Sequence, residues 1–166
     1  MNTLDVEDSV ESLATPTDLT DWLLSTALVD PGVRATDADL ARALTLREAL
    51  RSALAANHDD SPVPAAAVAT LRETVERGDL ALSMTAEGGW IAQPRATGVD
   101  GGLGALLVIV ANAMNDGTWR RLKVCVNDAC QWAFYDSSRA RSGKWCSMQI
   151  CGNRAKQQAW RTRHEV

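Results

Sequence analysis

The sequence has few of the residues that build an enzyme site. It holds only two histidines, His58 and His164, and neither lies in the His-x-Glu segment that activates water in a zinc deaminase. Residues 1–117 contain no Ser/His/Asp order and no phosphate-cradling glycine loop, since Gly101-Gly102-x-Gly104 is too short and follows no clear strand. We therefore expect a protein that is not an enzyme, in which both histidines are simply solvated.

The sequence also lacks an obvious targeting or membrane segment. Residues 1–5 have neither the basic nor the apolar region of a signal peptide. The longest apolar run, residues 105–111, is far shorter than the roughly 20 residues that span a bilayer. We expect a cytoplasmic protein with no membrane partner. Because cytoplasmic thiols stay reduced, its four cysteines point to metal binding before disulfides.

Charge is divided unevenly along the chain, although the net charge is only -4. Residues 1–117 carry 7 Lys and Arg against 18 Asp and Glu, a balance of -11. Residues 118–166 carry 10 Lys and Arg against 3 Asp and Glu, a balance of +7. A basic segment of this density suits a polyanion, which the acidic part would repel.

Hydrophobic periodicity predicts a mostly helical N-terminal part. We expect helices over residues 17–27, capped by Thr17, and over residues 36–56, 64–77 and 101–115. The last of these is apolar almost all round and should lie at the centre of the core. Between residues 80 and 95 the period becomes twofold, which predicts a β-hairpin with Trp90 in the core. The predicted fold class is α+β.

Four cysteines near the C-terminus have the spacing of a metal site. They form two Cys-x4-Cys pairs separated by 15 residues: Cys125, Cys130, Cys146 and Cys151. Four soft thiolates complete the tetrahedron that Zn²⁺ prefers, so no position stays open for a catalytic water. An iron-sulfur cluster is the alternative, but no signature supports it. The cysteines predict one structural zinc ion.

The residues around the cysteines predict a small finger. Short strands over residues 122–125 and 132–135 flank the first pair, and a helix from Met148 to about Arg163 follows Ser147 as its cap. Cys151 would lie in the first turn of this helix. Strand pair, cysteine knuckle and helix together describe a treble-clef-like zinc finger over residues 118–166.

This segment resembles the CGNR zinc-finger family, named for the run Cys151-Gly152-Asn153-Arg154. The matching features are Arg121-Leu122-x-x-Cys125, Cys130-x-Trp132-x-Phe134-x-Asp136, Ser138-Arg139-x-x-Ser142 and Lys144-Trp145-Cys146-Ser147-Met148. In that family the finger follows an α/β domain called ABATE, and the proteins are described as stress-related regulators of transcription.

Residues 1–117 resemble the ABATE domain more loosely. The likeness rests on Met1-Asn2-Thr3, Leu19-x-x-Trp22-Leu23 and Leu46-Arg47-x-x-Leu50-Arg51. ABATE domains usually begin with a strand that precedes the Asn-Thr pair, whereas this chain begins at that pair. Either the true start lies upstream or the first strand is missing, and a missing strand would leave the hairpin at residues 80–95 with an unpaired edge.

The resemblance implies a DNA-binding transcriptional regulator, associated with the nucleoid, whose finger presents a basic helix to double-stranded DNA. A small-molecule effector of the ABATE-like domain and a homodimer are compatible with this role. The alternative is a zinc-dependent adaptor that binds protein or RNA.

The basic finger holds the candidate nucleic-acid contacts. Ala155 and Ala159 should face inward, leaving polar groups outside. We expect phosphate contacts from Arg139, Arg141, Lys144, Lys156 and Arg163, and base contacts from Asn153, Arg154, Gln157 and Arg161. Asn153 and Arg154 could equally buttress the metal site through backbone carbonyls.

Overall fold

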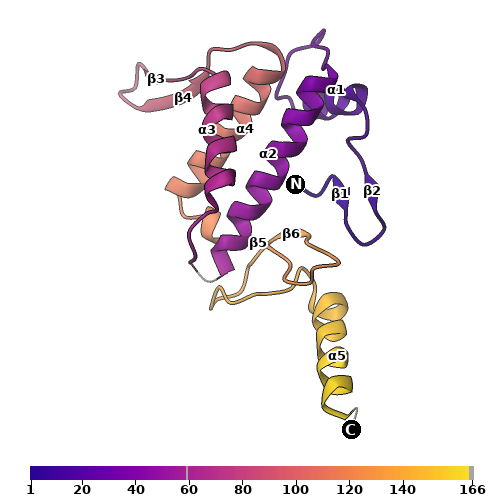
Figure 1. Ribbon diagram of the computed structural model, residues 1–166. Coiled ribbons are helices and arrows are strands. Elements are labelled where there is room, and N and C mark those ends of the chain that lie inside the picture. The colour runs from indigo at the N-terminus through magenta and orange to yellow at the C-terminus, as the bar shows by residue number, and fades with distance from the viewer. Residues whose placement is uncertain (59, 165–166) are drawn as a thin grey trace.

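Helices dominate the fold in the computed structural model, which describes residues 1–58 and 60–164 (Figure 1). Within these residues the helices are α1 (Pro16–Ser25), α2 (Asp37–Ala55), α3 (Ala65–Arg77), α4 (Gly98–Asn115) and α5 (Asn153–His164). Three antiparallel strand pairs join them: β1 (Leu4–Asp5) with β2 (Val10–Glu11), β3 (Leu80–Met84) with β4 (Trp90–Pro94), and β5 (Leu122–Val124) with β6 (Ala133–Tyr135). The predicted α+β class is confirmed.

Capping boxes fix where the first two helices begin. The Asp18 N–H donates to Thr15 Oγ1 at 3.2 Å, and the Asp18 carboxylate accepts from the Thr15 N–H at 2.8 Å. The cap is thus Thr15 and not Thr17, because Pro16 fits the first helical position, where no N–H is needed. Thr36 caps α2 in the same way, so this helix begins at Asp37.

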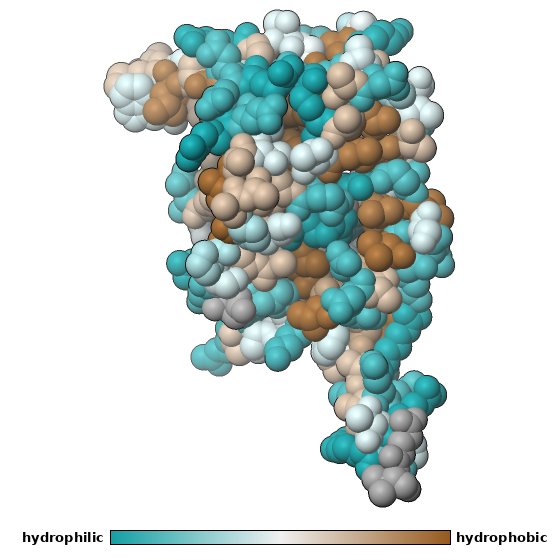
Figure 2. All heavy atoms as spheres, in the orientation of Figure 1, coloured by the Kyte–Doolittle hydropathy of each residue, from teal (hydrophilic) through white to brown (hydrophobic). Residues whose placement is uncertain are grey.

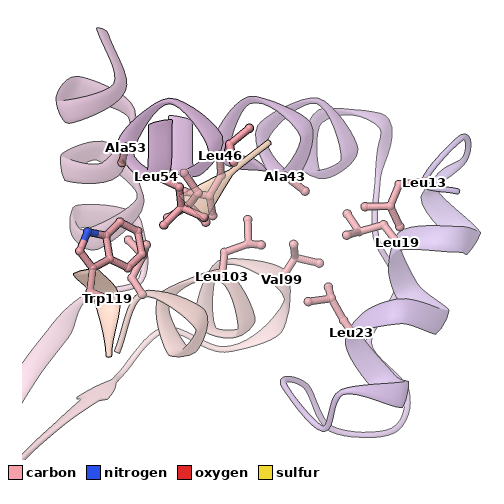
Figure 3. Close-up of a cluster of buried hydrophobic side chains, with 13 residues drawn as sticks. Leu13, Leu19, Leu23, Ala43, Leu46, Ala53, Leu54, Val99, Leu103 and Trp119 are labelled. Carbon is pink, nitrogen blue, oxygen red and sulfur yellow. The ribbon is translucent and has the colours of Figure 1, made fainter. Parts of the chain in front are cut away.

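The core forms where α2 packs against α1, α3 and α4. Figure 3 shows Leu46 and Leu54 of α2 facing Leu103 of α4, while Leu19 and Leu23 of α1 close one end of the cluster. Leu19 and Leu23 are four residues apart and Leu46 and Leu54 eight, so each pair lies on one face of its helix. Two residues that come after α4, Trp119 and Val124, belong to the same buried cluster, at 8% and 6% exposure. The core therefore reaches into the cysteine-bearing segment.

Helix α4 is buried only over its first half. A Cβ at Gly104 would lie 3.1 Å from the Cα of Gly78, so glycine lets α4 approach the end of α3 closely. The second half is open, with Ile109 at 57% and Met114 at 49% exposure. The prediction that this helix lies at the centre of the core therefore holds only for its first half, where Val99 and Leu103 are buried. By length and composition α4 could cross a membrane, a test that the core helix of a soluble protein also passes.

The hairpin β3–β4 forms as predicted but projects from the body. Only its base packs on α4, where a Cβ atom added at Gly104 would contact Leu80 and Pro94. Beyond the base, Leu82 is 71% and Trp90 is 66% exposed, so the prediction that Trp90 lies in the core was wrong. Figure 2 shows this hydrophobic tip at the upper left. Within the described residues no third strand pairs with the hairpin.

Candidate metal centre and its basic helix

Two segments of the finger bring the four cysteine sulfurs together. Cys125 directly follows β5, and Cys130 precedes β6. Cys146 lies before the turn that leads to α5, and Cys151 lies within that turn. All four Sγ atoms lie within 4.8 Å of one another. The Sγ atoms of Cys130 and Cys146 are 3.6 Å apart, and those of Cys146 and Cys151 are 3.7 Å apart. Zn–S bonds of about 2.3 Å in a tetrahedron place sulfurs about 3.8 Å apart, so the four cysteines fit one zinc ion.

Backbone hydrogen bonds shape the first knuckle, defined here as residues 125–130. The Cys130 N–H donates to the carbonyl of Asn127 at 2.8 Å, which closes the turn between the two cysteines. The Val126 N–H donates to the carbonyl of Lys144 at 3.0 Å, and this bond joins the first knuckle to the second pair of cysteines. These backbone hydrogen bonds orient the thiols in a way that does not depend on which metal ion binds.

The side chain of Asn127 also supports the metal site, a role that the sequence analysis missed. Its Nδ2 donates to Cys151 Sγ at 3.8 Å. Burial opposes ionisation of Cys151, but hydrogen bonds from Asn127 and the neighbouring thiols outweigh it and lower the pKa of this thiol. Burial and the neighbouring thiols raise the pKa of Cys146. Zinc must therefore displace protons from the thiols as it binds, and the hydrogen bond from Asn127 favours the Cys151 thiolate that zinc needs.

A buried ion pair forms the second support of the finger. Lys123 Nζ lies 3.0 Å from Asp136 Oδ2, and each side chain is 3% exposed. Lys123 also donates to the carbonyl of Arg141, while Asp136 accepts from the N–H of Gly143 at 2.7 Å and of Ser138 at 3.0 Å. The pair ties β5 and β6 to the loop before Cys146.

The second cysteine pair opens on a π-helical turn, Met148–Gly152, and α5 begins only at Asn153. The predicted helix start at Met148 was therefore five residues early, and Ser147 makes no side-chain cap. The Gly152 N–H instead donates to the carbonyl of Ser147 at 3.0 Å. The wider turn places Cys151, 2% exposed, just before the helix instead of on its surface.

Helix α5 points away from the rest of the molecule (Figure 1) and contains no buried residue. Ala159 is exposed, so the expected inward face made of Ala155 and Ala159 was wrong; Ala155 alone is half-buried. Trp160 and His164 stack on one side with ring centroids 4.5 Å apart. Figure 2 shows the mostly hydrophilic surface at the lower right. The helix displays four basic side chains and no acidic one: Arg154, Lys156, Arg161 and Arg163.

The other candidate contacts divide between the helix and a loop. Gln157 is exposed on α5, and Asn153 donates to the Gln149 carbonyl at 3.1 Å within the preceding turn. Arg154 Nη1 lies 2.7 Å from Glu7 Oε1 in the β1–β2 loop, 147 positions away. The exposed loop between β6 and Cys146 carries the remaining candidates, Arg139, Arg141 and Lys144.

His58, expected to be solvated, contacts the finger. Its Nε2 forms a hydrogen bond with the carbonyl of Val124, the residue before Cys125. Nothing in the local sequence predicted this contact, because the two residues lie 66 positions apart.

Fold and site together define a protein with a helical domain that carries a four-cysteine zinc finger. Residues 1–116 match the family model of ABATE, described as "Putative stress-induced transcription regulator", and the chain belongs to this family. Residues 121–164 match the CGNR zinc finger. No curated protein matches the chain at a significant level.

Proposed function

We propose that the protein is a DNA-binding regulator of transcription and that α5 contacts the double helix. The observation that carries the proposal is the state of α5, a 12-residue basic helix with no buried residue and no acidic residue of its own. Membership of a family described as transcription regulators supports it.

An isolated helix of this length is only marginally stable in water, and a helix that is polar on every side gains nothing from a core. The turn around Cys151 anchors the first residues of α5, but no residue of the helix is buried among the residues that the structure describes. DNA phosphates offer the missing partner, because each lysine or arginine that neutralises a phosphate releases counterions. The major groove is wide enough to admit such a helix.

Within the proposed complex the side chains divide by reach and chemistry. Asn153, Arg154, Gln157 and Arg161 are assigned to base edges, since amides pair with adenine and guanidinium groups with guanine. Phosphate contacts are assigned to Lys156 and Arg163 on α5 and to Arg139, Arg141 and Lys144 on the loop. The acidic domain, residues 1–117, would be repelled by DNA and so favours an approach through the finger.

The zinc ion has a structural role in this proposal. Four thiolates fill its tetrahedron, so no coordination position is left for water or substrate, and the proposal assigns no catalytic step to the chain. When bound, the ion holds the turn around Cys151 and thereby the head of α5.

Titration of fluorescent duplex DNA across a salt series tests the proposal. We expect log K to fall linearly with log salt, by about 0.9 for each phosphate neutralised. Arg161→Gln and Arg163→Gln should each weaken binding and reduce the slope by up to about 1. Arg95→Gln is the control, since it removes the same charge at the end of the β3–β4 hairpin, where Arg95 pairs with Asp79. No binding at low salt, or equal losses for Arg95→Gln, would overturn the proposal.

A second candidate, an adaptor that binds RNA or protein, is favoured by the exposed Trp160–His164 stack, because aromatic rings stack on unpaired bases. Parallel titrations with single-stranded RNA separate the two functions. Preference for duplex DNA supports the regulator, whereas preference for RNA supports the adaptor.

The proposal includes a small-molecule effector only if the protein has a pocket large enough to bind one. The apolar cavity between α1, α2 and α4, which Trp22, Leu46 and Arg47 help to line, holds about 40 Å³. Ligand pockets usually hold about 300 to 1,000 Å³. A groove of about 430 Å³ between α2 and the first knuckle, lined in part by Ser52 and Asp128, has the required size. A homodimer, which would double the DNA contacts, is tested by sedimentation with and without duplex DNA.

A further inference from the structure

Apolar and polar contacts both attach the finger to the helical domain. Trp119 and Val124 are buried in the common core, next to the end of α2. Three polar side chains of the helical domain, Asn2, Arg51 and His58, then bind the finger's backbone close to its first two cysteines.

Asn2 pairs with β6 as a strand would. Its Nδ2 donates to the carbonyl of Ala133 at 2.9 Å, and its Oδ1 accepts from the N–H of Ala133 at 2.8 Å. One amide side chain thus satisfies both backbone groups of a residue that follows Cys130 by three positions. The reciprocal bond fixes the outer edge of the short β5–β6 pair.

Arg51 binds the backbone at the C-terminal end of the first knuckle. Its side chain is 6% exposed, and its guanidinium donates to the carbonyl of Gln131, directly after Cys130. It also donates to the carbonyl of Met1 at 2.9 Å, and its Nε lies 3.0 Å from Glu48 Oε2. Gln131 has φ of 49°, a left-handed conformation that non-glycine residues rarely adopt. The bond from Arg51 helps to hold this strained residue.

His58 binds the backbone at the N-terminal end of the first knuckle, where its ring forms a hydrogen bond with the carbonyl of Val124, directly before Cys125. The neighbouring Asn57 donates from Nδ2 to the carbonyls of Trp119 at 2.8 Å and Leu122 at 3.0 Å. The backbone is therefore held on both sides of the knuckle by residues from the end of α2 and the turn after it.

We infer that Asn2, Arg51 and His58 are positioning residues of the zinc site, so that the helical domain holds the first knuckle ready for the metal. Within the described residues none of them forms a hydrogen bond with a cysteine sulfur; they act through the carbonyls and the strand next to Cys125 and Cys130. Binding and folding are linked, so zinc must in turn stabilise the helical domain. The inference is independent of DNA binding.

Zinc affinity of the full-length protein, measured by competition with a chelator of known affinity, tests the inference. Asn2→Ala and Arg51→Lys should each weaken zinc binding about tenfold, the loss typical of residues that orient metal ligands. Arg42→Lys is the matched control, because Arg42 also lies on α2 but pairs with Asp39 and Asp100 of the helical domain. It should bind zinc as wild type does.

The reciprocal measurement is the thermal unfolding of the helices, followed by circular dichroism with and without zinc. Zinc should raise the midpoint in wild type and raise it less in Arg51→Lys and Asn2→Ala. Because Asn2 is exposed, Asn2→Ala should fold even if Arg51→Lys does not. Wild-type zinc affinity in folded Asn2→Ala, or an equal loss in Arg42→Lys, would overturn the inference.

Discussion

Replacing Asp136 by asparagine would remove the charge from the buried ion pair of the finger. The Lys123 ammonium, 3% exposed, would keep only carbonyl partners such as that of Arg141. The asparagine would also turn an NH₂ group toward the N–H of either Ser138 or Gly143, which now donate to the two carboxylate oxygens at 3.0 and 2.7 Å. Loss of one partner from a buried pair costs about 3–5 kcal/mol, and we expect a loss in this range.

Equilibrium urea unfolding of the zinc-loaded protein measures this loss. Asp79→Asn is the control, because it breaks an ion pair with Arg95 that is exposed and should matter little. Adding Lys123→Met to Asp136→Asn should recover part of the stability, since no uncompensated ammonium then stays buried. A loss below about 1 kcal/mol for Asp136→Asn, or no recovery in the double variant, would refute the reasoning.

The same pair predicts a pH dependence. Burial opposes the charge on Asp136, but hydrogen bonds from Ser138, Lys123 and Gly143 outweigh it and hold the pKa of this carboxyl well below its usual range. Its contribution to stability is therefore complete above the unfolded pKa of about 3.9 and is lost as the pH falls toward the lower folded value. Asp136→Asn should lack this acid-sensitive component of the free energy of unfolding.

Three further predictions concern the finger. Gly143→Ala would place a Cβ 2.9 Å from the buried Asp136 carboxyl group, so we expect urea unfolding to show a loss of about 1–3 kcal/mol. Gly89→Ala should show little, because its Cβ would make an ordinary contact with Thr85 Oγ1 at 3.5 Å, and equal effects would contradict the packing argument. Asn127→Ala removes the donor that lowers the pKa of Cys151, so zinc should bind about tenfold more weakly and be released at higher pH in chelator competition; an unchanged release midpoint would exclude this role. Chelation of zinc should abolish the finger's dispersed amide NMR signals, and added zinc should restore them; a folded metal-free finger would contradict a structural role.

Local signals in the sequence determined the helices and the metal site. Four cysteines in two Cys-x4-Cys pairs predicted a closed zinc site, because each pair lies in one short turn and needs few distant partners. The predicted helix over residues 36–56 likewise depends on residues within a few positions, since Thr36 and Asp39 cap α2 and its buried leucines lie four residues apart. The periodicity that predicted the β3–β4 hairpin held for the same reason.

Exposure and long-range contacts were decided only by the tertiary structure. Trp90 is a large apolar residue of the kind that often lies in a core. It is exposed because the hairpin extends past helix α4, which covers only the base of the hairpin. Asn2, Arg51 and His58 reach the finger across 131, 80 and 66 positions, respectively. A polar side chain does not encode its partner at such separations, since the path of the chain brings the two together. The sequence by itself therefore predicted the zinc ligands, while the fold determined what holds them in place.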